Sequence, residues 1–362
     1  MQSICRKYII PTKEKVKGEG VKMLQQVLNA PENIIFREIP IPEVKEGQVL
    51  IKIHKIGICG TDIRVFEGEC KDISYPVTQG REAAGEIVAV GSEVQNLFPG
   101  QKVTVQPQIA CGYCRHCQKG KYNLCEKLKI LGFQRPGMAA EYFLANADSV
   151  ATLPKDISYE EGTMIEHLAV AVHAVKKAGN ITGKKVLVLG AGPVGVVTAQ
   201  AARGMGAASV MITDISEARL KIAKESGIDF CVNTAVNDLG DALERNFGSQ
   251  EVCVVYDCAG TNVTISQAVR YAGAGSRIIL VAVFRGMASV DLAALEDKEL
   301  KLYTTHMYRN EDYLDAISLV DEKRVNLKAL ISKHFSFREY AEAYRYIIEN
   351  RDRVMKVIID VQ

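Results

Sequence analysis

Neither sign of charge dominates this sequence of 362 residues, in which 45 lysines and arginines stand against 43 aspartates and glutamates. The formal net charge of +2 gives no strong electrostatic attraction to nucleic acid or to a membrane surface, so we expect neither as a partner. No apolar run approaches the roughly 18 residues that a membrane-spanning helix needs. The segment Met1–Pro11 also lacks the long apolar core and the cleavage site of a signal peptide.

A disulfide framework is also missing, although the chain has ten cysteines. Four of them lie close together in the sequence, and the others are scattered without the regular spacing of a small secreted domain. A reducing compartment fits this usage best, and we expect a cytoplasmic protein.

The clustered cysteines have the spacing C-x2-C-x2-C-x7-C, formed by Cys111, Cys114, Cys117 and Cys125. Two-residue gaps let successive sulfurs converge from a tight loop, and a fourth thiolate completes the tetrahedron of a structural zinc site. Because four thiolates leave no open coordination position, this zinc is expected to hold a loop, about 107–128, and not to catalyse. The alternatives are four unrelated buried thiols or a disulfide pair.

The length predicts two domains, because a single core rarely grows past roughly 250–300 residues. Residues 1–22 stand apart as an N-terminal extension. Residues 13–22 (KEKVKGEGVK) are charged and punctuated by glycine, with no periodic apolar face. We expect this extension to be disordered and to carry neither fold nor function.

From Met23 to about Tyr142 the pattern is typical of β-structure. Gln48–Ile56 (QVLIKIHKI) alternates apolar and polar residues, as a half-buried strand does. Shorter strands are predicted at Glu86–Val90 and Lys102–Val105, each next to a glycine turn. Such short strands favour a small barrel or sandwich. The segment 160–178 changes period and predicts a helix.

A second pattern begins at Lys185–Leu189 (KVLVL), a continuous apolar run of the kind that a parallel sheet buries on both faces. It leads directly into a G-x-G-x-x-G turn made of Gly190, Ala191, Gly192, Pro193, Val194 and Gly195. Glycines at these positions permit a tight turn and let the backbone approach a pyrophosphate, while the following helix supplies oriented N–H groups.

The residues after the turn predict which dinucleotide is bound. A helix at Val196–Met205 and a strand at Ser209–Thr213 lead to Asp214, where a carboxylate can bind the ribose hydroxyls. This carboxylate would repel a 2′-phosphate, so NAD is favoured over NADP. Arg219 lies close enough in sequence to tolerate the extra phosphate, but the carboxylate is expected to dominate.

Two further buried-strand patterns, Val252–Tyr256 and Arg277–Val283, have a helical segment between them. They continue the alternation of strand and helix that defines a doubly wound parallel sheet. The alternative is a glycine-rich turn in an α/β domain that binds no cofactor.

Taken together, these patterns resemble the zinc-containing medium-chain dehydrogenase/reductase superfamily, which includes the alcohol and polyol dehydrogenases. The resemblance covers roughly residues 23–361 and rests on Gly57–Asp62 (GICGTD), Gly80 and Glu82, the four cysteines, Glu166 and the turn at Gly190. It implies a GroES-like β-barrel catalytic domain, 23–175 and 307–362, interrupted by a Rossmann NAD-binding domain, 176–306. Glu166 points to the polyol branch, and the family implies a homodimer or homotetramer.

The resemblance assigns a catalytic zinc to Cys59, Glu82 and Glu166, but a histidine ligand is normally found where this chain has Arg81. A guanidinium has no lone pair for a metal. Three hypotheses follow. Zinc persists on the three remaining ligands, with His167 as a candidate fourth; or the metal is absent and Arg81 pairs with Glu82 or Glu166 and polarises the substrate oxygen; or this is an impaired variant that still binds NAD.

The resemblance also implies an NAD-dependent interconversion of a secondary alcohol (a polyol, a sugar or a sugar-derived alcohol) and its ketone. Thr61 matches the hydroxyl relay position of the family, although it could instead cap a helix together with Asp62. Val65 and Phe66 follow the Cys59 motif, and Thr304–Tyr308, including His306, are predicted to line the cleft between the domains. The alternative from another functional class is a non-catalytic NAD-binding scaffold or sensor.

Overall fold

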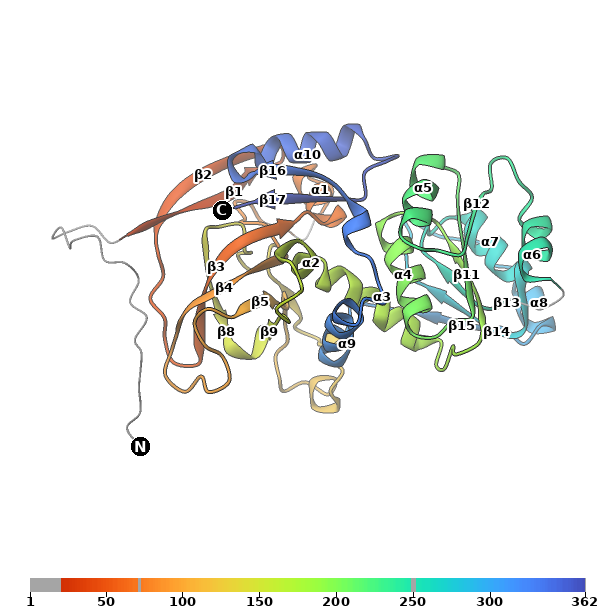
Figure 1. Ribbon diagram of the computed structural model, residues 1–362, viewed down its shortest axis with the longest axis horizontal. Helices are drawn as coiled ribbons and strands as arrows, with labels where there is room; N and C mark the ends of the chain where they lie inside the picture. The colour runs from red at the N-terminus through yellow and green to blue at the C-terminus, as the bar shows by residue number, and fades with distance from the viewer. Residues whose placement is uncertain (1–20, 71–72, 249–251, 362) are drawn as a thin grey trace.

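The computed structural model describes residues 21–70, 73–248 and 252–361, and it consists of two bodies side by side (Figure 1). One is rich in β-strands and contains both ends of the described chain, and the other is a layered α/β body. The chain enters the α/β body through helix α3 (Ile165–Lys177) and returns from it through α9 (Asn310–Asp321). Residues 1–20 of the predicted extension lie outside the described residues, and strand β1 already begins at Lys22.

The β-rich body is built on a seven-stranded sheet with the order β16-β17-β3-β4-β5-β9, in which β8 also pairs with β3. A hairpin, short helices and the cysteine-rich lobe surround this sheet. The sheet strands are β3 (Gln48–Gly57), β4 (Glu82–Val90), β5 (Lys102–Val105), β8 (Tyr142–Asn146), β9 (Val150–Thr152), β16 (Ile331–Ser336) and β17 (Lys356–Asp360). The other elements are β1 (Lys22–Ala30), β2 (Asn33–Pro40), α1 (Gly60–Phe66), β6 (Gln108–Ile109), η1 (Cys117–Lys119), η2 (Tyr122–Leu124), β7 (Lys129–Ile130), η3 (Ala147–Ser149), α2 (Tyr159–Thr163), η4 (Lys328–Leu330), η5 (Phe337–Glu339) and α10 (Tyr340–Glu349).

The register of this sheet determines where the functional site forms. Strand β3 ends at Gly57, which pairs with Glu82 at the start of β4 and with Ile358 in β17. The C-terminal end of β3, the start of β4 and the strand β17 therefore lie side by side at one end of these neighbouring strands. The last strand, β17, brings the C-terminal end of the chain back next to the loop that follows β3.

The α/β body contains six parallel strands in the order β12-β11-β10-β13-β14-β15. The strand order reverses at β10, which pairs with both β11 and β13, and open α/β sheets bind ligands at such a switch point. The elements are β10 (Lys185–Leu189), α4 (Pro193–Gly204), β11 (Ser209–Asp214), α5 (Glu217–Glu225), β12 (Phe230–Asn233), α6 (Leu239–Phe247), β13 (Val252–Asp257), α7 (Asn262–Tyr271), β14 (Ala272–Leu280), α8 (Leu292–Asp297) and β15 (Lys301–Thr304).

Several predicted elements are confirmed and some bounds are corrected. The strands at Gln48–Ile56, Lys102–Val105 and Lys185–Leu189 are present. The helix predicted over 160–178 is in fact two helices, α2 and α3, with Met164 between them. The strand predicted at Arg277–Val283 corresponds to β14, which ends at Leu280. The domain limits inferred above stay a prediction. None of the described helices has the length and apolar character to cross a membrane.

A buried ionic network joins α3 to α9. The carboxylate of Asp312, whose side chain is 1% exposed, lies 2.7 Å from His173 Nδ1 and 2.7 Å from Lys176 Nζ. Burial alone would raise the pKa of Asp312, but the hydrogen bonds with His173 and Lys176 lower the pKa to about 2. The network therefore fixes the two helices that connect the bodies, and it depends on an ionised carboxylate.

We expect Asp312→Asn to lower the free energy of unfolding by about 3 kcal/mol, because it leaves buried polar partners without their anion. Asp315→Asn is the matched control, because Asp315 pairs with the same lysine but its side chain is 52% exposed; we expect it to cost below about 1 kcal/mol. Since the pKa of Asp312 is lowered in the folded state, its contribution is present above the ordinary value of 3.8 and is lost as the pH falls toward 2. Urea unfolding of the three proteins at neutral and acidic pH measures this difference, and equal stabilities at neutral pH would contradict it.

Candidate functional site

The site lies at the end of the sheet where the end of β3, the start of β4 and the strand β17 are neighbours. Cys59 precedes helix α1, and its backbone N–H donates to Asp62 Oδ2 over 3.1 Å. Asp62 therefore caps the start of this helix and is fully buried (0% exposed). Thr61 Oγ1 lies 3.7 Å from Cys59 Sγ, so the two predicted site residues are adjacent in space. Cys59 is the N-cap residue and forms a capping box with Asp62, so Thr61 does not cap the helix.

Arg81 is buried, and its guanidinium pairs with Asp62. Nε and Nη2 both donate to Asp62 Oδ1, over 3.3 and 3.2 Å. The Phe133 ring covers the guanidinium, with its centroid 3.9 Å from Cζ. The expected pairing of Arg81 with Glu82 or Glu166 is therefore wrong. Asp62 takes the arginine because it comes from the adjacent α1 turn, whereas Glu82 has another partner.

That partner is Lys356, the first residue of β17. Lys356 Nζ donates to Glu82 Oε2 over 2.6 Å and to the carbonyl of Ile58 over 3.3 Å. The exposed fractions of the two side chains are 2% and 0%. The other carboxylate oxygen, Glu82 Oε1, is buried and has no hydrogen-bond partner among the described residues. The sequence reasoning missed Lys356, and its available signal was a single lysine inside the apolar run 354–359 (VMKVII).

Two neighbouring residues of α3 face this cluster. Burial, and then the negative charge of Glu82, raise the pKa of Glu166 to about 7. Burial and the Lys356 ammonium lower the pKa of His167 to about 3, so this imidazole is neutral. His167 Nε2 is buried without a partner in the described part of the chain. Helix α3 also packs against α4, so it links the charged cluster to the helix that follows the glycine turn.

The charged cluster does not fit a catalytic zinc. Burial raises the pKa of the Cys59 thiol to about 11, although Arg81 opposes the shift. Among the described residues, ligand atoms of three or more Cys, His, Asp or Glu residues come within 4.8 Å of one another only in the four-cysteine lobe. Cys59, Glu82 and Glu166 do not form such a group. Two buried cations, Arg81 and Lys356, already balance the charges of Asp62 and Glu82, and a dication would be repelled there.

The lobe, in contrast, fits a structural zinc. Its four Sγ atoms lie within 4.8 Å of one another, and the cysteines are free thiols, so the disulfide alternative is wrong. Backbone N–H groups of Cys111 and Lys127 donate to Cys125 Sγ over 3.2 and 3.3 Å, as expected around thiolate ligands. Backbone hydrogen bonds at Cys117 and Glu126 lower the pKa of Cys114 to about 6.

The lobe also holds the segment in which the chain leaves β15. Asn123 Nδ2 donates to the carbonyl of His306 over 2.9 Å, and Gln108 Nε2 donates to that of Tyr308 over 3.1 Å. Tyr308 is buried, while the His306 side chain is exposed. Val65 and Phe66, which follow the Cys59 motif, lie in the hydrophobic core of the β-rich body.

The glycine turn has the geometry that a dinucleotide requires. Gly190 adopts a φ of +96°, which side-chain-bearing residues rarely take. A Cβ on Gly195 would lie 1.8 Å from the carbonyl oxygen of Gly190, so only glycine lets α4 approach the turn. Gly192 caps α4 without a side chain, and Pro193 is its first residue, followed by Val194. The N–H groups of the first helical turn remain available to an anion.

Asp214 ends β11 beside this turn. Its Oδ2 accepts from the backbone N–H of Ala191 over 2.8 Å, and its Oδ1 accepts from Ser216 over 2.9 Å. Arg219 Nη1 lies 3.8 Å from Asp214 Oδ2, and its Nη2 donates to the carbonyl of Arg351. The carboxylate is thus fixed at the turn, next to a guanidinium.

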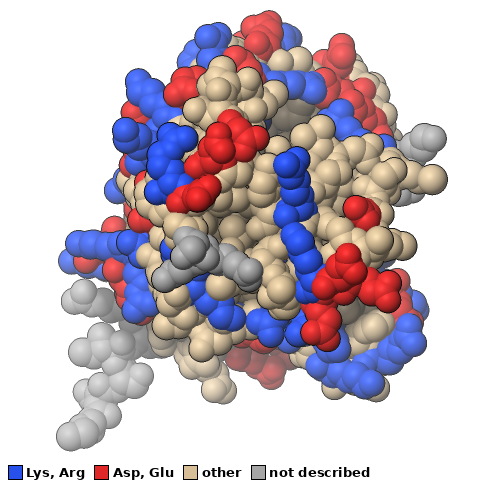
Figure 2. Space-filling view, turned by 90° about the vertical axis from the view of Figure 1, so that its right-hand side faces the viewer, with Lys and Arg blue, Asp and Glu red and all other residues tan. Residues whose placement is uncertain are grey.

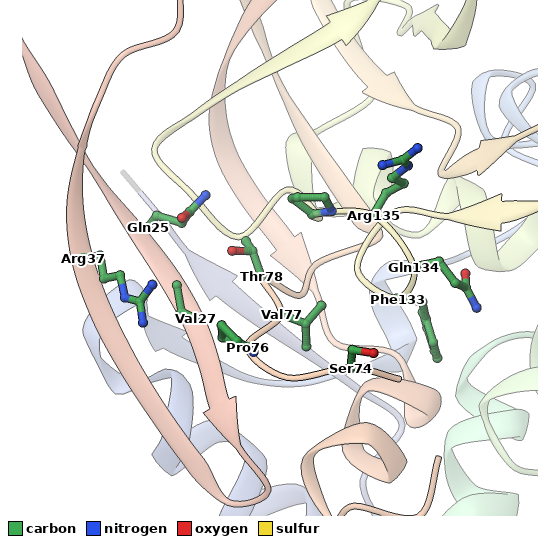
Figure 3. Close-up of a pocket in the computed structure, with 11 residues that line it drawn as sticks. Gln25, Val27, Arg37, Ser74, Pro76, Val77, Thr78, Phe133, Gln134 and Arg135 are labelled. Carbon is green, nitrogen blue, oxygen red and sulfur yellow. The ribbon is translucent and has the colours of Figure 1, made fainter. Parts of the chain in front are cut away.

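An open pocket of about 450 Å³ lies on the outer side of the β-rich body (Figure 3). Gln25, Val27 and Arg37 of the β1–β2 hairpin line one side, and Phe133 and Gln134 lie at the other. Phe133 therefore lines this pocket and also contacts the guanidinium of Arg81. Figure 2 shows acidic and basic side chains intermixed with uncharged ones on the end of the α/β body. This face therefore carries no extended basic surface.

Two protein-family models match this chain, one in each body. The model of the alcohol dehydrogenase GroES-like domain matches residues 45–155, and that of the zinc-binding dehydrogenase family matches residues 193–322. The chain belongs to the zinc-containing medium-chain dehydrogenase/reductase superfamily. Within it, the chain falls in the sorbitol dehydrogenase-like branch. The predicted fold, a GroES-like domain combined with a Rossmann domain, is confirmed.

Individual relatives agree with this assignment. Sorbitol dehydrogenase from Ovis aries is 35% identical over 327 residues, which is 89% of this chain and 92% of the relative. Galactitol-1-phosphate dehydrogenase from Escherichia coli superposes with a TM-score of 0.85 at 30% identity, covering 94% of this chain and 100% of that one. A zinc-binding dehydrogenase from Sinorhizobium meliloti, bound to NADP, superposes with a TM-score of 0.86 at 30% identity and the same coverage.

The glycine turn yields a direct test. We expect Gly195→Ala to lower the free energy of unfolding by about 3 kcal/mol and to weaken NADH binding, because the new methyl group overlaps the backbone at Gly190. Gly192→Ala is the control, because the nearest atom to its added Cβ is Arg219 Nη1 at 4.0 Å; it is expected to fold normally. Thermal unfolding and NADH fluorescence titration measure both effects. Equal stability of the two variants would show that the close helix approach is not required.

Proposed function

We propose that this protein is an NAD-dependent dehydrogenase that interconverts a secondary alcohol (a polyol, a sugar or a sugar-derived alcohol) and its ketone. The observation that carries the proposal is the packing of α3, the helix that carries Glu166 and His167, against the cofactor helix α4. Glu166 is close enough to Glu82 and Arg81 for their charges to influence its pKa. A substrate held at the cluster would therefore lie beside the helix contact that leads to a dinucleotide bound at the turn.

NAD, when bound, would accept or supply the hydride at its nicotinamide ring. The chain's own residues would position it: the first turn of α4 faces the pyrophosphate, and Asp214 binds the ribose hydroxyls. The fixed carboxylate of Asp214 supports NAD over NADP, even though Arg219 lies beside it and one structural relative binds NADP. At the substrate end, Cys59, Thr61, Glu82 and Glu166 would surround the hydroxyl, with Thr61 passing its proton toward solvent.

A polyol class is supported by the relatives, which include sorbitol and galactitol-1-phosphate dehydrogenases. The number of polar groups at the cluster also suits a substrate with several hydroxyls. A non-catalytic scaffold or sensor is not favoured, because the relatives are named for dehydrogenase activity. The free thiols of the lobe support a reducing compartment such as the cytoplasm.

Self-association is the remaining part of the proposal, and we place its interface at the β15 edge of the six-stranded sheet. Strand β15 is exposed along its length, with Leu302 41% and Tyr303 38% exposed. Val283 and Met287, in the loop between β14 and α8, are 80% and 100% exposed. An unpaired edge with apolar side chains suits a second copy of the chain. Sedimentation equilibrium is expected to give a dimer or tetramer, shifted toward monomer by Leu302→Glu; a monomeric wild-type protein would contradict this.

Turnover is the direct test of the proposed function. With sorbitol, galactitol, 2,3-butanediol and related alcohols, we expect reduction of NAD by at least one compound and a clear preference over NADP. Asp214→Asn is expected to shrink that preference by about tenfold, because it removes the charge that repels the 2′-phosphate. Asp241→Asn, an exposed change on α6, is the matched control. NADH binding without turnover of any alcohol or ketone would reject the dehydrogenase assignment in favour of a sensor.

A further inference from the structure

At the substrate end of the site, the positive charges of Arg81 and Lys356 balance the negative charges of Asp62 and Glu82 without a metal. Two buried ion pairs, Arg81–Asp62 and Lys356–Glu82, occupy it. Each cation is matched by one carboxylate, and each pair has a contact at or below 3.2 Å. A dication bound to Cys59 and Glu82 would have to displace the ammonium from Glu82 and tolerate the guanidinium beside it. The buried ion pairs therefore occupy the space and the charge that a catalytic zinc would need.

The Nη1 nitrogen of Arg81, with its two N–H groups, stays free to donate to another molecule. Its Nε and Nη2 are both used by Asp62 Oδ1, whereas Nη1 makes no hydrogen bond with the described residues. Nη1 is also absent from the described side-chain atoms that are fully buried without a partner. The Asp62 pair on one edge and the Phe133 ring on one face fix the orientation of the guanidinium. A fixed cation with a free N–H stabilises negative charge that develops on a substrate oxygen.

We propose that this centre holds no catalytic metal and that Arg81 Nη1 donates to the substrate oxygen in place of one. The inference rests on the proposed dehydrogenase function. In alcohol oxidation the carbinol C–H bond breaks, and the hydrogen leaves with both bonding electrons to oxidised NAD. The O–H bond breaks and its proton passes to water, while the carbon–oxygen double bond forms. Arg81 stays protonated throughout, and Lys356 neutralises Glu82 so that the developing alkoxide does not face an unpaired carboxylate.

The metal content tests the first half of the proposal without requiring turnover. Elemental analysis of protein purified without added metal is expected to find about one zinc per chain, held by the lobe. Cys59→Ser is expected to keep that zinc, and Cys114→Ser is expected to lose most of it. About two zinc atoms in the wild type, or loss of zinc in the Cys59→Ser protein, would overturn the proposal. If the Cys114→Ser protein fails to fold, the wild-type and Cys59→Ser results still decide.

Chemical rescue tests the second half. Arg81→Ala is expected to lower kcat by about 100-fold, while NADH affinity changes by less than about threefold. Millimolar guanidinium is expected to restore part of that turnover, which a merely structural arginine would not show. Arg64→Ala, an exposed arginine on α1 paired with Glu69, is the control and should keep normal kcat with no response to guanidinium.

Two results would overturn the role of Arg81: unchanged kcat in a folded Arg81→Ala protein, or lost kcat that guanidinium does not restore. Failure of the dehydrogenase proposal has a different signature. In that case the wild-type protein binds NADH but turns over no substrate, and its zinc content still reports whether the charged cluster holds a metal.

Discussion

The ion pair between Lys356 and Glu82 is the interaction on which the site depends. It joins the first residue of the last strand to the first residue of β4, and both side chains are almost completely buried. Burying two charges is costly unless each finds its partner. The pair therefore requires β17 to pair alongside the end of β3. The neighbouring pair of Arg81 and Asp62 is subject to the same requirement from the α1 side. The return of the C-terminal segment therefore completes the site as well as the sheet.

The same buried region reaches the cofactor body through α3. This helix carries Glu166 and His167 near the charged cluster, and it packs against α4. The Asp312 network then ties α3 to the returning helix α9. This chain, which matches the zinc-binding dehydrogenase model, thus keeps the four-cysteine lobe but has two cations at the substrate end. The chemistry that remains for the protein is electrostatic: a fixed positive charge beside a bound dinucleotide.

How much the sequence predicts depends on how local each feature is. The cysteine spacing and the glycine turn are contained in short segments, so their geometry follows from the chain itself: the four sulfurs converge and Gly190 takes a positive φ. Lys356 lies 274 residues from Glu82, and no local pattern marks a lysine in a strand as the partner of a distant carboxylate. The partner of Arg81 was predicted wrongly for a related reason. The sequence showed that a guanidinium replaced a metal ligand, but the choice among Asp62, Glu82 and Glu166 depended on which carboxylate Lys356 had already taken.

The most direct test of this account is a crystal structure of the protein with NADH, with anomalous data collected on both sides of the zinc absorption edge. The account predicts one anomalous peak per chain, inside the cluster of Cys111, Cys114, Cys117 and Cys125. It also predicts Arg81 and Lys356 in their ion pairs, with no peak near Cys59. A second zinc peak between Cys59 and Glu82, with Lys356 displaced, would contradict the account.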